Sequence, residues 1–329
     1  MSGFFGSIVK KLRPTDSNED LSNEAKIKIE SCIETCNPGP GCCEGTVSNK
    51  DLETFNKLKI DKETPLMNSS KTNKLHFIIP TSKKDWKHDA VTEFNNDTVP
   101  YELFTWVKSN KRKYQNSTLS TAPAEEPFMC NVSSMAIDIM DIDQLKFRKS
   151  NVLILPYFIT LHNLVFDKVA PLFNELVPLL MNTGGNDATP TFEAIQELCG
   201  KYGVTISKSN DRGVIFLCSH TTRDKRCGIT APILLKYFHE FLTDPYDSFR
   251  NDSDTREGGY RVAYVNHVGG HKFAANTIIY LNNINDPLLI WLGRVTPKDV
   301  QPIVENVLIP EVPRLPYPEK VRCIKKYNW

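Results

Sequence analysis

The stretches Gly213-Val-Ile-Phe-Leu-Cys218 and Tyr260-Arg-Val-Ala-Tyr-Val265 decide the fold predicted for this chain. Both are short, apolar and rich in β-branched and aromatic residues, which is typical of buried strands. Between them, residues 232–242 have the spacing of a helix, and Pro232 suits a helix start because the first turn leaves N–H groups unpaired anyway. Apolar strands over 277–281 and 288–292 and a helix over 297–307 follow. This order predicts an α/β domain of the thioredoxin-like type.

The first half of the chain contains the same kinds of segment. Residues 74–80 and 152–158 are apolar runs that predict strands, and residues 166–181 have the apolar spacing of a helix on a sheet. Residues 1–72 are polar and irregular, so we expect a loosely packed, partly disordered region there with one helix near 23–35. The predicted units are therefore an N-terminal region over 1–72 and two domains over 73–205 and 206–329.

An internal comparison indicates a duplication. Residues 77–88 align without gaps on residues 216–227, although chance similarity between two strand–helix openings would give the same match. In this alignment the first half lacks the Cys and His residues of the second: Ile79 stands for Cys218, His88 for Cys227, Cys130 for His267 and Ser134 for His271. The sequence therefore predicts a degenerate thioredoxin-like domain in the first half.

Length and charge limit the classes of function. The 329 residues suffice for two domains, and 40 basic against 39 acidic residues leave a formal net charge of +1. This balance creates no field that would favour nucleic acid or an anionic membrane, so recognition must be local. The longest apolar run near the start, residues 4–9, is too short for a secretory or transmembrane segment. We expect neither a nucleic-acid partner nor a membrane span.

The cysteines and the N-terminus bear on the compartment. Nine cysteines without regular spacing favour reduced thiols or metal ligands over a disulfide framework. Phe5, Ile8 and Leu12 fall at helical spacing beside basic residues, as in a mitochondrial targeting peptide. Such peptides avoid acidic residues, and Asp16 and Glu19 follow directly, so the sequence favours the cytoplasm over the mitochondrial matrix.

Four residues could bind one metal group: Cys218, Cys227, His267 and His271, in the patterns Cys-x8-Cys and His-x3-His. Thiolates and imidazoles are ligands of zinc and of iron–sulfur clusters, whereas magnesium and calcium prefer carboxylates. Cys218 ends a predicted strand and Cys227 opens the next helix, so both thiols are expected at one end of the sheet. Two glycines between the histidines allow a tight turn in which both rings face one site. Four ligands from two loops could enclose a binuclear cluster.

Three alternatives compete with a cluster. A structural zinc site accepts two Cys and two His, but its paired cysteines are usually roughly two to four residues apart. A thiol–disulfide active site usually has a Cys-x-x-Cys pair and does not use loop histidines. The four residues could also be unrelated buried thiols and surface imidazoles, which is the common situation for a lone histidine.

These residues resemble the signature of the thioredoxin-like ferredoxins, also called the sucrase/ferredoxin-like family. The resemblance extends from about Leu52 onward and rests on Cys218-Ser-His-Thr-Thr-Arg-Asp-Lys-Arg-Cys-Gly228, His267-Val-Gly-Gly-His-Lys272 and Trp291-Leu-Gly-Arg-Val-Thr-Pro297. It implies a [2Fe-2S] cluster bound by Cys218, Cys227, His267 and His271. It also implies that the cysteines hold the iron that stays ferric and the histidines the reducible iron.

The implied ligands have an electrostatic consequence. Two thiolates and two neutral imidazoles leave an oxidised cluster near neutrality, so an electron enters more readily than with four thiolates. We expect a reduction potential above that of plant-type ferredoxins, toward the roughly −150 to +300 mV of Rieske centres. Each bound imidazole keeps an N–H group that can ionise, so the potential should fall as pH rises.

Basic residues flank these ligands. A redox partner or an anionic electron donor could dock on them, and a solvated loop balanced by Asp224 is the alternative. They are Arg223, Lys225, Arg226 and Lys272. His220 is expected beside the site or exposed, and not as a ligand, because four ligands are already supplied.

The remaining cysteines and the C-terminus give weaker signals. Irregular spacing in a Pro/Gly-rich segment favours exposed thiols over a second metal site at Cys32, Cys36, Cys42 and Cys43. Interior packing is expected for Cys130, Cys199 and Cys323. The terminal Trp329 resembles the aromatic tags by which client proteins engage the cytosolic iron–sulfur assembly machinery, although Asn328 is not the acidic or serine residue usual before it.

The sequence thus predicts an electron-transfer protein with a [2Fe-2S] cluster, acting in redox, oxidative-stress or metal homeostasis. Its donor and acceptor are unknown, and the residues suggest electron transfer rather than turnover of a substrate by an enzyme. The alternative is a zinc-binding or metal-free adaptor protein linked to actin patch organisation.

Overall fold

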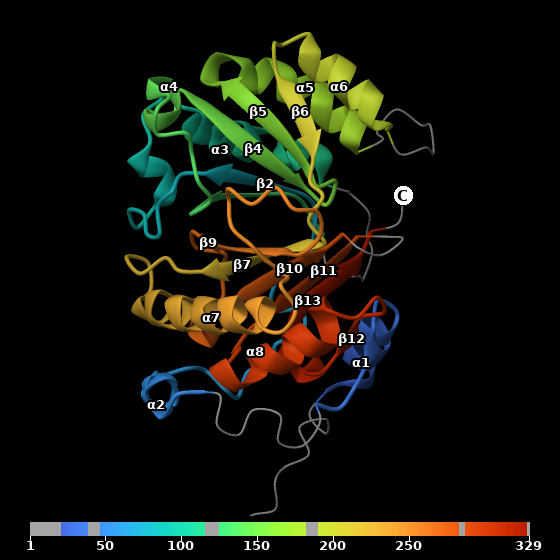
Figure 1. The fold of residues 1–329 in the computed structure, drawn as a ribbon. Helices are drawn as coiled ribbons and strands as arrows, with labels where there is room; N and C mark the ends of the chain where they lie inside the picture. The colour runs from blue at the N-terminus through green and yellow to red at the C-terminus, as the bar shows by residue number, and fades with distance from the viewer. Residues whose placement is uncertain (1–20, 39–46, 116–124, 182–189, 283–286, 328–329) are drawn as a thin grey trace, which may run out of the picture.

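One large sheet of parallel and antiparallel strands runs through both halves of the chain (Figure 1). The structure, a computed structural model, describes residues 21–38, 47–115, 125–181, 190–282 and 287–327. Along the sheet the order is β13 (Val321–Lys326), β11 (Leu288–Leu292), β10 (Thr277–Leu281), β7 (Gly213–Cys218), β9 (Tyr260–Val265), β3 (Glu126–Ser133), β2 (Asn73–Pro80), β4 (Lys149–Leu155), β5 (Ile159–Val165) and β6 (Thr205–Lys208). A short strand, β8 (Phe249–Arg250), also pairs with β9.

The two halves of the sheet share one strand order. In the second half β7 and β9 are parallel, β10 is antiparallel to β7, and β11 is antiparallel to β10. In the first half β2, β3, β4 and β5 take the corresponding places with the same directions. The predicted strands over 213–218, 260–265, 277–281 and 288–292 are confirmed, and so is an α/β fold with a mixed sheet.

Helices cover the outer face of each half, and the inner faces of the two halves pack on each other (Figure 1). The helices of the first half are α3 (Val99–Asn110), α5 (Val169–Leu180) and α6 (Phe192–Gly200), and those of the second are α7 (Lys225–Thr243) and α8 (Pro297–Ile303). Three buried apolar clusters result, one under each helical layer and one between the halves. The middle cluster joins Ile78 and Leu155 of the first half to Phe216, Ile278 and Trp291 of the second.

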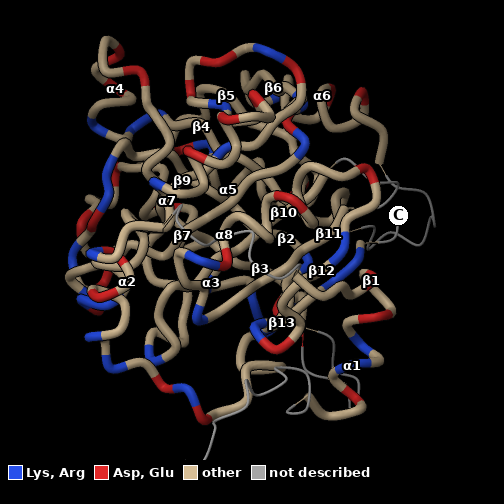
Figure 2. The backbone as a smooth tube through the Cα atoms, turned by 60° about the horizontal axis from the view of Figure 1, so that its bottom comes forward, with Lys and Arg blue, Asp and Glu red and all other residues tan. Residues whose placement is uncertain are grey.

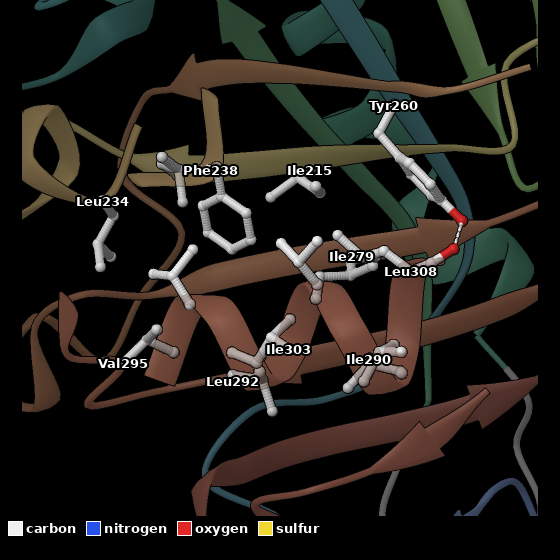
Figure 3. Packing of buried hydrophobic residues seen from close by; sticks show 14 of the residues in the cluster. Ile215, Leu234, Phe238, Tyr260, Ile279, Ile290, Leu292, Val295, Ile303 and Leu308 are labelled. Carbon is white, nitrogen blue, oxygen red and sulfur yellow. Dashed lines mark hydrogen bonds between the residues drawn. The ribbon is translucent and has the colours of Figure 1, made fainter. Parts of the chain in front are cut away.

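The cluster under α7 and α8 shows how strands and helices meet (Figure 3). Ile215 of β7, Phe238 of α7 and Ile303 of α8 lie in this cluster. Full burial of such a side chain stabilises a fold by ~1.5–3 kcal/mol. The Tyr260 hydroxyl lies among these residues and donates a hydrogen bond to the Leu308 carbonyl. The strand that precedes the histidines is thereby fixed to the segment after α8.

Helix α7 begins earlier than predicted. The Asp224 carboxylate accepts a hydrogen bond of 2.9 Å from the Arg226 N–H and caps the helix, which therefore starts at Lys225. The prediction that Pro232 stands near the helix start was wrong, since Pro232 lies inside the helix. The apolar spacing begins only after the polar first turn, so it hid the true start. The last predicted helix ends as an α-helix at Ile303 and continues as a wider turn over Val304–Leu308.

The strand registers correct one part of the proposed duplication. Phe77 pairs with Cys130, and Phe216 pairs with Ala263. If Phe77 corresponds to Phe216, Cys130 corresponds to Ala263 inside the strand. The assignment of Cys130 to the place of His267 was therefore wrong, because the connections between the paired strands differ in length in the two halves.

The described part of the N-terminal region packs on the second half. Helix α1 (Asn23–Glu30) ends before residue 35, and a second helix, α2 (Asn49–Asn56), was not predicted. The pair β1 (Glu34–Thr35) and β12 (Arg314–Leu315) joins this region to the end of the chain. Several of its side chains enter the cluster under α7 and α8, namely Ile29, Ile33, Val47 and Phe55. These described residues are not loosely packed, in contrast to the prediction.

Charged residues are interspersed along the backbone in Figure 2, as the balanced composition predicted. Ion pairs between distant segments accompany this pattern, for example Lys236 with Asp51, whose nitrogen and oxygen lie 3.0 Å apart. None of the described helices combines the length and the apolarity that a membrane crossing requires.

A buried histidine joins the two halves. Nε2 of His76 lies 3.0 Å from Oδ1 of Asn131, and its Nδ1 lies 3.1 Å from the hydroxyl of Tyr280. Nδ2 of Asn131 in turn lies 2.5 Å from Oδ1 of Asn266, which follows β9. Complete burial lowers the pKa of His76 to about 4, so the ring is neutral at physiological pH.

This pKa predicts acid sensitivity of the contact between the halves. The unfolded chain protonates His76 near pH 6.5 and the folded chain only near 4, so stability is complete above pH 6.5 and falls as pH drops through this window. The loss should amount to ~3 kcal/mol at most. Urea unfolding of the wild type and of His76→Gln between pH 4 and 6.5 measures this loss of unfolding free energy. Equal pH slopes for both proteins would contradict this assignment.

Candidate metal centre

The four predicted ligands lie at one end of the sheet of the second half. Cys218 is the last residue of β7, and Cys227 lies in the first turn of α7. His267 and His271 follow β9, the parallel neighbour of β7. Because parallel strands end at the same sheet edge, the loop with the cysteines meets the loop with the histidines.

The two thiols form a buried, hydrogen-bonded pair. Cys218 is 2% exposed and Cys227 is 0% exposed. The Cys227 thiol, the His267 ring and the backbone N–H groups of Val268 and His220 hold the pKa of Cys218 well below its usual value, although burial acts in the opposite direction. The bond to Cys218 and burial raise the pKa of Cys227, because a second thiolate would lie beside the first. The two pKa values are thus shifted in opposite directions, and Cys218 is the more acidic thiol of the pair.

Two glycines turn the chain between the histidines. Gly269, with φ 84°, and Gly270, with φ 66°, adopt left-handed conformations that other residues rarely adopt. The ring centroids of His267 and His271 lie 5.1 Å apart, with an angle of 44° between the ring planes. Nδ1 of His271 is buried and has no hydrogen-bond partner within the described part of the chain. Since a buried polar atom without a partner is unfavourable, this nitrogen is a candidate ligand.

The four candidate donors form two pairs. The thiol pair and the imidazole pair are joined by the contact of Cys218 with His267. In the described ranges, no three His, Cys, Asp or Glu side chains are grouped so that they could hold one metal ion. Thiolates and imidazoles are ligands both of structural zinc and of binuclear iron–sulfur clusters.

The first half of the chain holds the loop between the cysteines. The Ser219 hydroxyl donates to the Lys84 carbonyl over 2.7 Å. The Asp85 carboxylate accepts the backbone N–H of Thr222 at 3.2 Å and the Thr222 hydroxyl at 2.7 Å. Both halves therefore build the site, although the ligands come from the second half alone.

His220 connects the first half to the loop with the histidines. It is buried, and its Nε2 lies 3.1 Å from the Trp86 carbonyl and 2.9 Å from the Lys87 carbonyl, so Nε2 carries the proton. Its Nδ1 therefore accepts the backbone N–H of His267, over 3.1 Å. His220 lies beside the candidate site, as predicted, but its partners come from a segment far away in the chain and were missed.

Two of the basic residues proposed as a docking patch are paired within the protein. Nη2 of Arg226 lies 2.7 Å from Oδ2 of Asp224, and Nζ of Lys272 lies 2.9 Å from Oδ2 of Asp61. Thr64 donates to the Asp61 carboxylate as well and helps to lower its pKa. Such pairing is what the alternative of a balanced, solvated loop predicts, and docking of a partner stays a prediction.

The other cysteines that the structure describes lie apart from this site. Those of the N-terminal region that the structure describes, Cys32 and Cys36, are half-buried free thiols, while Cys42 and Cys43 fall outside the described residues. Interior packing is confirmed for Cys199 and Cys323, and Cys130 is half-buried. Trp329 and the basic N-terminal segment, residues 5–13, also fall outside the described residues.

Comparison with known proteins identifies the family. A model of the sucrase/ferredoxin-like family matches residues 66–323, which is most of the chain. The chain belongs to the sucrase/ferredoxin-like family. The resemblance seen in the sequence motifs is thereby confirmed.

Two kinds of curated relative are similar to this member of the family. It is 45% identical over 331 residues to actin patches distal protein 1 of Saccharomyces cerevisiae, covering 98% of this chain and 99% of that protein. It is 37% identical over 98 residues to altered inheritance of mitochondria protein 32 of Clavispora lusitaniae, covering 30% of this chain and 31% of that protein. The protein of the same name from Debaryomyces hansenii is 38% identical over 104 residues, covering 31% of this chain and 34% of that protein. No solved structure matches the chain.

The turn between the histidines predicts different effects for its two glycines. A Cβ atom on Gly270 would lie 2.2 Å from Nη2 of Arg322, whereas a Cβ on Gly269 would meet no atom within 4 Å. Both Gly→Ala variants add backbone strain of ~1 kcal/mol, and only Gly270→Ala adds a steric clash. Urea unfolding should show a loss for Gly270→Ala that exceeds the loss for Gly269→Ala by ~1–3 kcal/mol. Equal losses would mean that the turn tolerates a side chain at both positions.

Proposed function

We propose that this protein transfers electrons by means of a [2Fe-2S] cluster held by Cys218, Cys227, His267 and His271. The observation that supports this most is the contact between a buried thiol pair and an imidazole pair. The unpartnered Nδ1 atom of His271 adds to it, and so does membership in a family described as sucrase/ferredoxin-like.

The residues around this site suit such a group. When bound, the cluster would supply a one-electron couple. Burial of both cysteines keeps water from the sulfur atoms, and the low pKa of Cys218 makes a thiolate available for binding. If His271 binds through Nδ1, its proton remains on Nε2, where it can be lost at high pH.

We further propose that each half is a thioredoxin-like domain and that the first half is a degenerate copy. The shared strand order and directions of the two halves support this proposal. The proposed boundaries remain 73–205 and 206–329, with residues 1–72 as an N-terminal extension.

A second candidate function is an adaptor role in actin patch organisation, with zinc or without a metal. The similarity to actin patches distal protein 1 covers nearly the whole chain and favours this candidate. The lack of a group for a single metal ion among the described residues agrees with a metal-free form. The comparisons therefore support the adaptor role more directly than electron transfer, whereas the chemistry of the four side chains favours the cluster.

The cytoplasm is the compartment we propose. The name of the actin-patch relative agrees with it, while the name of the shorter relatives refers to mitochondria. We propose two kinds of partner. One is a redox donor or acceptor that docks beside Lys225, and the other is the cytosolic iron–sulfur assembly machinery, which would bind through Trp329.

Metal and sulfide analysis of anaerobically purified protein tests the two candidates. With a cluster, the protein is coloured, contains iron and acid-labile sulfide in equal amounts, and gives an EPR signal on reduction. Cys218→Ala and Cys227→Ala should lose the iron, and Cys199→Ala, which removes a buried thiol elsewhere, should keep it. A colourless wild-type protein, with zinc or no metal, would rule out the cluster. If, in addition, the variant with both Cys218→Ala and Cys227→Ala supported normal actin patches in cells, the adaptor role would be favoured.

Histidine ligation predicts a reduction potential that depends on pH. A bound imidazole loses its outer proton more readily from the oxidised site, so the midpoint potential should fall as pH rises from about 7 to 10. Voltammetry of the purified protein measures this slope. A constant potential over the whole range would argue against histidine ligands.

The C-terminal tag makes a separate prediction in cells. If Trp329 engages the assembly machinery, deletion of this residue should lower the fraction of protein that carries iron without changing the folding of the chain. Iron content of the protein isolated from cells, together with its unfolding curve, measures both effects. Full iron content after the deletion would remove Trp329 from the proposal.

A further inference from the structure

Arg322 is a charged residue in the interior of the protein. It lies in β13, between the buried residues Val321 and Cys323, and its side chain is 1% exposed. Among the ion pairs of the described residues none includes Arg322. A buried charge is unfavourable unless other groups compensate it. The groups that compensate the buried charge of Arg322 therefore indicate what this residue does.

One of its hydrogen bonds reaches the turn between the histidines, and the others reach Asn276 and Ser69. Nη1 of Arg322 donates to the Gly269 carbonyl over 2.9 Å and to Oδ1 of Asn276 over 2.6 Å. Nε and Nη2 donate to the hydroxyl and the carbonyl of Ser69, over 3.1 and 2.9 Å. The Asn276 carbonyl in turn accepts the N–H of Cys218 over 3.1 Å. Arg322 is thus linked to the loop of each ligand pair.

The guanidinium also fills the space behind the turn. It lies over the rings of Trp291 and Phe273, with centroid distances of 5.0 and 5.3 Å. Gly270 packs against it so closely that a Cβ atom there would come within 2.2 Å. A lysine could keep the charge in this space, but it could not reproduce the planar set of donors.

Arg322 keeps its charge in this buried position. Burial lowers its pKa to about 10, so the guanidinium stays protonated at neutral pH. Its hydrogen bond to the Gly269 carbonyl places this charge beside the turn between the histidines.

We propose that Arg322 is a positioning residue, which holds the turn between His267 and His271 against Asn276 and places a fixed positive charge beside that turn. Its effect on a cluster rests on the function proposed above, whereas its hold on the turn does not. A fixed positive charge stabilises a site that gains an electron, so Arg322 raises the reduction potential.

The experiment compares Arg322→Gln and Arg322→Lys with Arg250→Gln in the full-length chain. Arg250 is a matched control, because it is also buried and donates to the carbonyls of Asp247 and Phe249, away from the ligands. In metal-free protein, Arg322→Gln should speed hydrogen exchange at residues 268–271 by about tenfold, which corresponds to the loss of one hydrogen bond. Arg250→Gln should leave these amides unchanged.

The midpoint potential distinguishes the effect of the Arg322 charge from the effect of its hydrogen bonds. In iron-loaded protein, Arg322→Gln should shift the midpoint potential to lower values. Arg322→Lys should keep most of the potential but lose iron to a chelator faster than the wild type. Unchanged exchange in Arg322→Gln, or equal changes in Arg250→Gln, would overturn the positioning role. An unchanged potential in Arg322→Gln would overturn the charge effect.

If the wild type takes up no iron, the function proposed above fails, and the hydrogen-exchange experiment still decides whether Arg322 holds the turn.

Discussion

The apolar cluster between the two halves is the interaction on which the rest of the structure depends. In each half the described helices cover one face of the strands, and the other face is buried against the opposite half. Phe216 and Ile278 of the second half meet Ile78 and Leu155 of the first. Within this contact His76 is held neutral and bonded to Asn131. The two halves therefore share one sheet and one buried apolar cluster.

Packing of the halves also builds the surroundings of the four candidate ligands. It brings the segment with Lys84 and Asp85 onto the loop that follows Cys218. His220 extends this contact to the backbone of His267. On the other side, Arg322 holds the turn between the histidines. Segments far away in the sequence thus hold the two short loops that carry the candidate ligands, and a preorganised site follows from the fold.

The sequence predicted those features that depend on local patterns. Fully buried strands appear as continuous apolar runs, so the strands ending at Cys218 and at Val265 could be placed to the residue. The proximity of the four candidate ligands could be predicted as well, because loops after parallel strands meet at one sheet edge. The start of α7 was missed, since its cap at Asp224 precedes the apolar spacing. Docking of α1 and α2 on the second half and the role of Arg322 could not be predicted, because both depend on partners from distant segments. The only local indication that Arg322 has a special role was its position as a charged residue within a buried strand.

Pulsed EPR of the reduced protein with ¹⁵N-labelled histidine would test the proposed cluster directly. We expect two strongly coupled histidine nitrogens at the cluster, one of them absent in His267→Cys and the other in His271→Cys. A signal without coupled histidine nitrogen, or a reduced protein without any iron signal, would contradict it.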